Sequence, residues 1–139
     1  MIYYIETSAL LRSVLREAGY QEFKAKIEAA KIRVSSVLTM MEARRALNRL
    51  LNTGTLTEKD QRQLQGFIAR LSSGWDLLEI TPDVQERVGN GFPIEPVRTL
   101  DAIHLASALE FSRIYPDLRV MTSDERISAN LEPLGLLEV

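Results

Sequence analysis

Four carboxylates of this sequence stand where a strand-like stretch gives way to a helix-like one. Glu6 closes the apolar run IYYI, and Asp124 follows the run RVMTS. Glu42 lies in the first turns of the helical pattern after VSS, and Asp101 lies in the first turn of the pattern TLDAIHLASAL. In open α/β sheets, ligands bind at the carboxyl ends of the strands. The sequence therefore predicts that the four acids share one edge of a sheet.

The neighbours of two of these acids distinguish them from ordinary helix caps. An exposed acid in the first turn of a helix complements the helix dipole, and each of the four taken alone has that simpler explanation. Asp101 is flanked by Leu100 and Ala102, however, and Glu42 follows two methionines. Because such apolar neighbours are not the setting of a solvated cap, the combination favours a functional site.

Convergence of the four carboxylates has a definite chemical consequence. Their mutual repulsion would raise their pKa values unless cations were bound between them. Oxygen ligands around a small cavity suit Mg²⁺ or Mn²⁺, whereas zinc prefers histidine or cysteine. A metal held in this way can activate water and stabilise an in-line displacement at phosphorus.

The elements that would position these acids follow from an alternation of short apolar runs with amphipathic stretches. Strands are predicted at residues 2–5, 32–35, 76–80 and 118–122, with a short last one at 136–139. Helices are predicted at residues 8–18, 20–30, 39–52, 83–89, 99–113 and 124–131. A further helix is predicted from an N-cap at Thr57, with Asp60 at the capping-box position, to about Leu71. Strands that alternate with helices predict an α/β fold with a mainly parallel sheet.

The ends of the first helix have their own signals. Gly19 can adopt the left-handed backbone conformation and is predicted to stop the helix. Ser8 is the predicted N-cap, with Thr7 as the alternative. Either hydroxyl could also bond Glu6 or a metal-bound water.

Length, composition and charge set further bounds. The chain has 139 residues, 45% of them hydrophobic and 26% charged, so one domain over residues 1–139 is expected. A formal net charge of −2 excludes a generally basic nucleic-acid coat but not a nuclease with a local arginine patch. The chain has no cysteine, which excludes disulfides and thiolate metal sites and fits a cytoplasmic location. No membrane span is expected, because no apolar run approaches the roughly 18 residues of a spanning helix. No secretory signal is expected, because no basic region precedes the apolar start.

Four stretches of the chain resemble, in order and spacing, the acidic motifs of PIN-domain ribonucleases. They are IYYIETSALL, SSVLTMMEARRAL, RTLDAIHLASAL and VMTSDERI with the LGL that follows, and they span essentially the whole chain. The chain is most similar to the VapC-like toxins of type II toxin–antitoxin pairs. The resemblance implies a three-layer α/β/α PIN-like fold and a Mg²⁺-dependent endoribonuclease, with Mn²⁺ as a possible substitute. It also implies a homodimer that cuts RNA and is neutralised by a cognate antitoxin.

The same resemblance assigns roles to individual residues. The four motif acids fall on Glu6, Glu42, Asp101 and Asp124, which would be the catalytic residues. Glu6, Asp101 and Asp124 would be ligands of one or two Mg²⁺ ions. Glu42 would be a further ligand or would position a bound water. Supporting hydroxyls are expected from Ser8, Thr122 and Ser123.

Glu6 departs from the family pattern, in which the first acid is usually Asp. The extra methylene moves the carboxylate by about 1 Å, and a misplacement of that size can cost about a hundredfold in rate. Glutamate can still ligate a metal with a rotated side chain or through a water. Two functions therefore stay open: a nuclease that works with Glu6, and a degenerate PIN domain that binds RNA or a partner with weak or no nuclease activity.

Arginines are expected to surround the acidic centre. Those in segments near the four acids, predicted to contact RNA, are Arg12, Arg45, Arg49, Arg98 and Arg126. Each alone has the simpler explanation of a solvated helix face with an ordinary salt bridge. A rim of arginines around an acidic centre is nevertheless what a phosphodiester backbone needs.

Two further features have a structural explanation and a functional one. His104, the sole histidine, lies three residues after Asp101 on nearly the same helix face. A packed histidine with a local hydrogen bond is favoured over a general base, since metal-bound water needs no imidazole. The second feature is the apolar stripe Leu64, Phe67, Ile68 and Leu71, which is predicted to be core. In the resembled family, this region forms a groove for an antitoxin helix.

Overall fold

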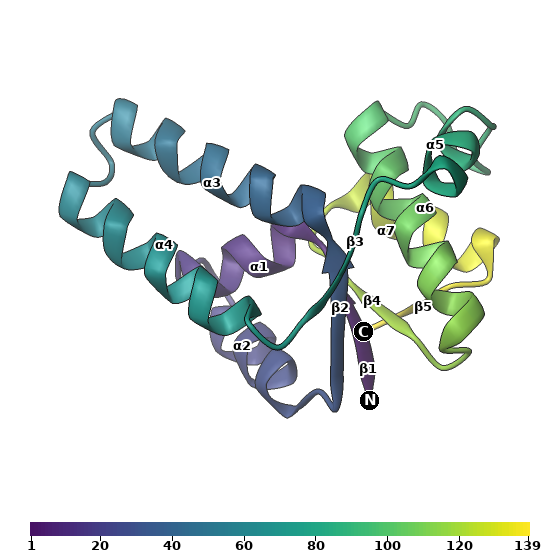
Figure 1. Ribbon diagram of the computed structural model, residues 1–139, viewed down its shortest axis with the longest axis horizontal. Helices are drawn as coiled ribbons and strands as arrows, with labels where there is room; N and C mark the ends of the chain where they lie inside the picture. Colours follow the sequence, from purple (N-terminus) through teal and green to yellow (C-terminus); the bar gives the residue numbers. More distant parts are fainter.

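A five-stranded parallel sheet forms the centre of the protein, whose computed structural model describes residues 1–139 (Figure 1). The strands are β1 (Ile2–Ile5), β2 (Ile32–Ser36), β3 (Asp76–Leu78), β4 (Arg119–Met121) and β5 (Leu137–Glu138). They are arranged in the order β3-β2-β1-β4-β5, and every strand pair is parallel. The predicted parallel sheet is therefore confirmed, with the first strand in the middle.

Seven helices cover the two faces of this sheet. They are α1 (Thr7–Val14), α2 (Tyr20–Ala29), α3 (Val37–Asn52), α4 (Glu58–Ser72), α5 (Pro82–Val88), α6 (Thr99–Ile114) and α7 (Glu125–Leu131), with a 3₁₀ turn at Glu132–Leu134. Helices α1 to α4 lie on one side of the sheet and α5 to α7 on the other (Figure 1). The result is the predicted three-layer α/β/α fold. None of these helices has the length and apolar content needed to span a bilayer.

The side chains of β1 build one hydrophobic core on each face of the sheet. Tyr3 and Ile5 belong to the core beneath α1 to α4, and Tyr4 belongs to the core beneath α6 and α7. Successive side chains of a strand point to opposite faces, and here both faces are covered. This double burial explains why the run IYYI is apolar throughout instead of alternating with polar residues.

The start of α1 differs from the prediction. Neither Ser8 nor Thr7 is the N-cap, because that position is taken by Glu6, whose carboxylate accepts a hydrogen bond from the backbone N–H of Ser8. A glutamate is not among the preferred N-cap residues, so propensity favoured the hydroxyls. The position of Glu6 directly after the last residue of β1 decides the cap.

The end of α1 also differs from the prediction. The helix stops at Val14, well before Gly19, and Arg16 adopts a left-handed backbone conformation with φ 53°. Gly19 is also left-handed, with φ 79°, but it precedes α2 as the N-cap of that helix. The glycine signal was therefore correct about the conformation and wrong about which helix it bounds.

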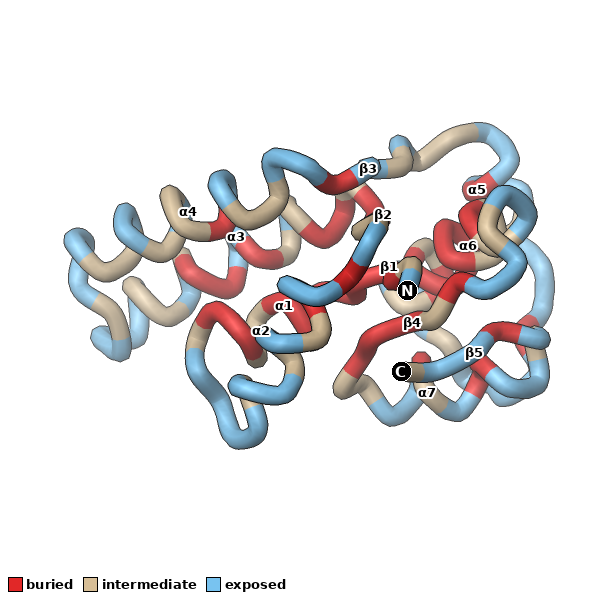
Figure 2. The backbone as a smooth tube through the Cα atoms, turned by 90° about the horizontal axis from the view of Figure 1, so that it is seen from below, coloured by how far each residue is buried: buried red, intermediate tan, exposed pale blue.

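Helices α3 and α4 form a long hairpin that projects away from the sheet (Figure 1). Thr57 and Asp60 form the predicted capping box at the start of α4. The tip of the hairpin is exposed, whereas the faces nearer the sheet contain buried residues (Figure 2). The hairpin therefore packs on the core along its inner face, and the exposed side chains lie mainly on its outer face and around its tip.

Candidate active site

The carboxyl ends of the two central strands carry the first and the fourth of the predicted acids. The register pairs Ile5 of β1 with Met121 of β4, and the backbone N–H of Glu6 donates to the Met121 carbonyl at 3.0 Å. Asp124 follows β4 as the N-cap of α7. Chain order reverses between β1 and β4, since β2 and β3 lie on one side of β1 and β4 and β5 on the other. Open α/β sheets bind ligands at such a reversal.

An open pocket of about 620 Å³ lies at this edge, and three of the four acids line it. Glu42 comes from the second turn of α3, Asp101 from the first turn of α6, and Asp124 from the N-cap of α7. The structure thus brings together acids from the starts of three different helices, and the first and last of them are 82 positions apart.

Electrostatic repulsion among these acids is visible at Asp101. Burial of the carboxyl raises its pKa, and the nearby charges of Asp124 and Glu42 raise it further, while His104 and Arg126 offset part of the effect. A raised pKa means that negative charge is unfavourable at this position in the metal-free protein. A cation bound among the carboxylates would relieve that cost.

Asp124 is held in place by the helix that it caps. Its Oδ1 atom accepts hydrogen bonds from the backbone N–H groups of Arg126 and Ile127, at 2.9 and 3.0 Å. The other carboxylate oxygen makes no hydrogen bond within the protein and is available to a ligand. The cap role and a ligand role are therefore compatible.

Glu6 lies close to Glu42 but is not among the residues that line the pocket. Its side chain is buried, with 5% of the residue exposed. Its Oε2 atom accepts hydrogen bonds from the Ser8 backbone N–H at 3.0 Å, from the Ser8 hydroxyl, and from the Thr122 hydroxyl at 2.8 Å. Its Oε1 atom lies 3.8 Å from Nε2 of His104. One oxygen of this carboxylate is therefore already satisfied by the protein.

The three predicted supporting hydroxyl residues lie at this junction between β1 and β4. The Ser8 hydroxyl lies 3.3 Å from that of Thr122 and accepts the backbone N–H of Ser123 at 2.9 Å. The Thr122 hydroxyl accepts the backbone N–H of Asp124 at 3.0 Å. Ser8 and Thr122 thus hold Glu6 through their side chains, and Ser123 contributes its backbone.

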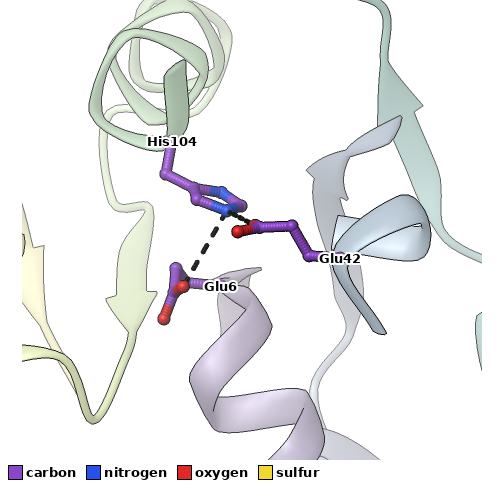
Figure 3. A group of neighbouring side chains, drawn as sticks. All are labelled: Glu6, Glu42 and His104. Carbon is purple, nitrogen blue, oxygen red and sulfur yellow. Dashed lines mark hydrogen bonds and ion pairs between the residues drawn. The ribbon is translucent and has the colours of Figure 1, made fainter. Parts of the chain in front are cut away.

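Glu6 and Glu42 meet at His104, which sequence reasoning did not place in the site (Figure 3). One ligand atom from each of the three side chains lies within 4.8 Å of the other two. Oε1 of Glu42 lies 2.6 Å from Nε2 of His104 and accepts the Thr7 hydroxyl at 2.7 Å. Burial raises the pKa of Glu42, but the hydrogen bonds from His104 and Thr7 outweigh it and leave this pKa below its ordinary value.

His104 itself is packed as predicted but bonded differently. It is 2% exposed, which confirms the buried helix histidine. The expected local hydrogen bond was wrong, because its partners Tyr4, Thr7 and Glu42 are 62 to 100 positions away. The signal that could have found Tyr4 is strand alternation, which turns Tyr4 toward the α6 face. No local pattern pointed to Thr7 as a partner.

The family follows from comparison with known sequences. The model of the PIN domain family matches residues 3–130. The chain belongs to the PIN-domain family. Ribonuclease VapC46 of Mycobacterium tuberculosis is 34% identical over 134 residues, which cover 96% of this chain and 92% of that protein. Ribonuclease VapC45 of the same species is 28% identical over 136 residues, which cover 95% and 90%. The predicted similarity to VapC-like proteins is confirmed.

Solved structures of VapC proteins share the fold of this PIN domain. VapBC2 from Rickettsia felis, bound to a DNA fragment from its promoter, matches with a TM-score of 0.65 and 11% identity. VapC20, the Sarcin–Ricin loop cleaving toxin of Mycobacterium tuberculosis, matches with a TM-score of 0.66 and 19% identity. Each match covers 100% of this chain and 98% of the other. At such low identities the likeness concerns the fold alone.

The five arginines predicted to contact RNA lie in three different places in this PIN domain. Arg98 and Arg126 line the acidic pocket. Arg45 and Arg49 are exposed on α3 and do not line it. Arg12 packs its guanidinium over the Phe23 ring at 5.0 Å from the ring centre, at the α1–α2 contact, and its Nε is buried without a hydrogen bond. The structure therefore gathers two of the five at the acids.

The apolar stripe of α4 packs into the PIN domain. Ile68 is buried in the core beneath α1 to α4, and Leu64, Phe67 and Leu71 are packed against that core. The predicted core role is confirmed. A small pocket of about 250 Å³ remains between α3 and α4, lined by Met40, Arg44, Gln65, Ile68, Ala69 and Ser72.

Proposed function

We propose that this PIN domain, over residues 1–139, is a Mg²⁺-dependent endoribonuclease and the toxin of a toxin–antitoxin pair. The observation that carries the proposal is the convergence of Glu42, Asp101 and Asp124 on one open pocket, with a carboxylate oxygen of the buried Glu6 within 4.8 Å of one of Glu42. The names of its VapC relatives support RNA as the substrate class. The raised pKa of Asp101, caused by burial and by the charges of Asp124 and Glu42, supports a bound cation, because His104 and Arg126 offset only part of it.

The donor set fits a hard divalent cation. The pocket offers carboxylate oxygens, which Mg²⁺ and Mn²⁺ prefer, and no thiolate. We assign Glu6, Asp101 and Asp124 as ligands, and Glu42 as a further ligand or as the group that orients a bound water. The bound cation would supply a water of lowered pKa and neutralise charge on the phosphate.

The two arginines of the pocket bind and orient the substrate. Arg98 precedes α6 as its N-cap residue and Arg126 lies in the first turn of α7, so they flank Asp101 and Asp124 from separate helices. Guanidinium groups bond phosphate oxygens in a bidentate manner. Arg98 and Arg126 thus hold the RNA backbone across the acidic centre, where a scissile phosphate faces the carboxylates.

A second function, binding without cleavage, is favoured by the state of Glu6. Hydrogen bonds from Ser8 and Thr122 engage Oε2 of Glu6, and the side chain is buried. A carboxylate committed in this way is a weaker ligand than a free one. A degenerate PIN domain of this kind would bind RNA or a protein partner and cut little or nothing.

Cleavage of a panel of structured RNAs separates the two functions. The native protein and Glu6→Asp are compared with Mg²⁺, with Mn²⁺ and with EDTA, and Asp124→Asn serves as the inactive control. Metal-dependent cleavage by the native protein supports the nuclease. Cleavage by Glu6→Asp alone means that the native protein is the degenerate form. Cleavage that persists in EDTA or in Asp124→Asn would contradict the assigned site.

We also propose a cognate antitoxin as the partner, a homodimer as the assembly and the cytoplasm as the location. The structural match to a VapBC complex supports an antitoxin. The pocket between α3 and α4 offers a partner helix an apolar floor at Ile68 with Arg44 at its margin. Light scattering of the purified chain gives its oligomeric state, and co-expression with a candidate antitoxin, followed by co-purification, checks the partner.

A further inference from the structure

His104 occupies a buried position between Glu6 and Glu42, and the chemistry proposed above assigns it no role. Both of its ring nitrogens are hydrogen-bonded. Nδ1 lies 2.9 Å from the hydroxyl of Tyr4, and Nε2 lies 2.6 Å from Oε1 of Glu42 and 3.1 Å from the hydroxyl of Thr7. A buried ring with partners at both nitrogens is held in one orientation.

The chemistry of the partners decides which nitrogen carries the hydrogen. An ionised carboxylate can only accept, so Nε2 must donate to Glu42. The hydroxyl hydrogen of Thr7 is already donated to Glu42, so toward His104 the Thr7 oxygen can only accept. In the neutral ring, Nδ1 is then the acceptor, and the Tyr4 hydroxyl donates to it. Burial and the charge of Glu6 raise the pKa of Tyr4 well above its ordinary value, so this hydroxyl keeps its proton.

We propose that His104 is a positioning residue whose Nε2–H, oriented by Tyr4, fixes the carboxylate of Glu42 for a cation in the acidic pocket. This inference rests on the proposed function, because it concerns the metal of that site. It gives His104 a role, which the four acids alone do not explain. The role is carried by geometry and hydrogen-bond chemistry, without a change in the charge of the ring.

Fixing Glu42 matters because this side chain is long and partly exposed. Its side chain is 26% exposed at the wall of the pocket. Two donors hold Oε1, from Thr7 and His104, while Oε2 makes no hydrogen bond within the protein. The carboxylate is therefore restrained through one oxygen and offers the other. Hydrogen-bond partners of ligating carboxylates orient them, and their loss typically costs about 10- to 100-fold in metal affinity or activity.

The arrangement also argues against His104 as a direct ligand. A metal ligand needs a nitrogen lone pair, but Nε2 carries the hydrogen that bonds Glu42. The lone pair at Nδ1 points to Tyr4 and away from the carboxylates. The two roles therefore predict different results for a substitution that keeps an N–H donor but removes the ring. Metal binding should be preserved if His104 is a positioning residue and weakened if His104 is a direct ligand.

Mn²⁺ affinity, measured by calorimetry on the full chain, tests the proposal without reference to RNA cleavage. His104→Leu removes the hydrogen bonds of both ring nitrogens and is expected to weaken Mn²⁺ binding by about 10- to 100-fold. His104→Gln places an N–H donor near the position of Nε2 and is expected to restore most of the affinity. Tyr4→Phe deletes only the hydroxyl that orients the ring and is expected to have an intermediate effect.

A double-mutant cycle assigns the effect to Glu42. Glu42→Gln is made alone and together with His104→Leu, and the two losses should not add if His104 acts through Glu42. Full additivity would overturn the proposal. Nitrogen hyperfine coupling to bound Mn²⁺ in electron spin-echo spectra would also overturn it, since it would make His104 a ligand. Thermal unfolding of each variant confirms the fold, and His104→Gln and Tyr4→Phe carry the comparison if His104→Leu does not fold.

Asp101→Asn separates failure of this inference from failure of the proposed function. If Asp101→Asn leaves Mn²⁺ affinity unchanged, the metal site itself is wrong, and the inference falls with it. If Asp101→Asn weakens Mn²⁺ binding while His104→Leu does not, the metal site stands and only the role of His104 is wrong.

Discussion

The acidic site has two halves that the fold treats in opposite ways. In the inner half, Glu42 is hydrogen-bonded to His104 and to the Thr7 hydroxyl, and Glu6 is hydrogen-bonded to the hydroxyls of Ser8 and Thr122. In the outer half, Asp101 and Asp124 line an open pocket together with two arginines. The pKa of Glu42 is lowered, despite burial, by hydrogen bonds from His104 and Thr7, whereas the pKa of Asp101 is raised by burial and by neighbouring acids.

This contrast shows how a cluster of like charges can exist in a folded protein. The inner carboxylates are stabilised by the protein's own donors, so their geometry is set before any ligand binds. In the outer half, Asp124 is held through one oxygen by two backbone N–H groups, whereas negative charge on Asp101 is unfavourable at an open surface, where a cation and a phosphate backbone can reach it. Preorganisation is thus most complete in the inner half, and ligand attraction belongs to the outer half.

The largest expected effect is loss of cleavage when the outer half is neutralised. Asp124→Asn should lower RNA cleavage by at least about a hundredfold, because it removes charge that the metal and the reaction need. Asparagine is as good an N-cap as aspartate, so α7 should remain intact. A fluorescent RNA assay in Mg²⁺, with circular dichroism to confirm folding, measures both. Near-native cleavage would mean that the outer half is not the reaction centre.

Next in size is the contribution of the pocket arginines to RNA binding. Arg98→Ala and Arg126→Ala should each weaken RNA binding by about tenfold and lower the salt dependence by about one phosphate contact. Mn²⁺ affinity should not change. Arg45→Ala is the matched control, because Arg45 is exposed on α3 outside the pocket. Fluorescence anisotropy at several salt concentrations measures the RNA affinity of each variant. An equal loss of affinity in Arg45→Ala would show that the pocket arginines contribute no more to RNA binding than the exposed arginine on α3.

A smaller effect concerns stability and pH in the metal-free protein. Because the pKa of Asp101 is raised in the folded state, the folded protein binds a proton at this carboxyl more readily than the unfolded chain does. Stability should therefore increase as the pH falls through the raised pKa. The lowered pKa of Glu42 affects stability in the opposite direction. Its stabilising contribution is present at neutral pH and is lost as the pH falls through the lowered pKa.

Asp101→Asn isolates the first of these contributions. In EDTA at neutral pH the variant should be more stable than the native protein, by a few degrees in Tm, because it removes an unfavourable charge. The difference should shrink on acidification, as Asp101 becomes protonated in the native protein. Thermal unfolding between about pH 4 and pH 7 measures it. A variant that is less stable at neutral pH would show that burial and neighbouring acids do not make the charge of Asp101 unfavourable.

The smallest effect is expected far from both halves. Thr57→Ala removes the capping-box hydroxyl of α4 and should cost about 1 kcal/mol of unfolding free energy. RNA cleavage and Mn²⁺ affinity should stay unchanged, because α4 contributes no residue to the acidic pocket. Urea unfolding of this variant beside Thr57→Ser, which keeps the hydroxyl, measures the cost. A change in cleavage would reveal coupling between the hairpin and the site.

Much of this protein was predictable because the signals are local. The apolar run before Glu6 is a strand buried on both faces, and Thr57 with Asp60 starts a helix through bonds within four residues. The acids Asp101 and Asp124 lie at helix starts, where the pattern placed them. Strand period, helix period and capping are properties of near neighbours, and a sequence displays them directly.

The rest depended on contacts between distant segments. Burial of Glu6 depends on Thr122, which β4 brings to the end of β1, and the role of His104 depends on Tyr4 and Glu42 from two other elements. The choice of Arg98 and Arg126 over the other arginines depends on where α6 and α7 meet the sheet. Local sequence patterns indicated the candidate acids and the elements that carry them. Strand order and packing decided which of them meet, because hydrogen bonds between residues 60 to 120 positions apart require the sheet to bring those residues together.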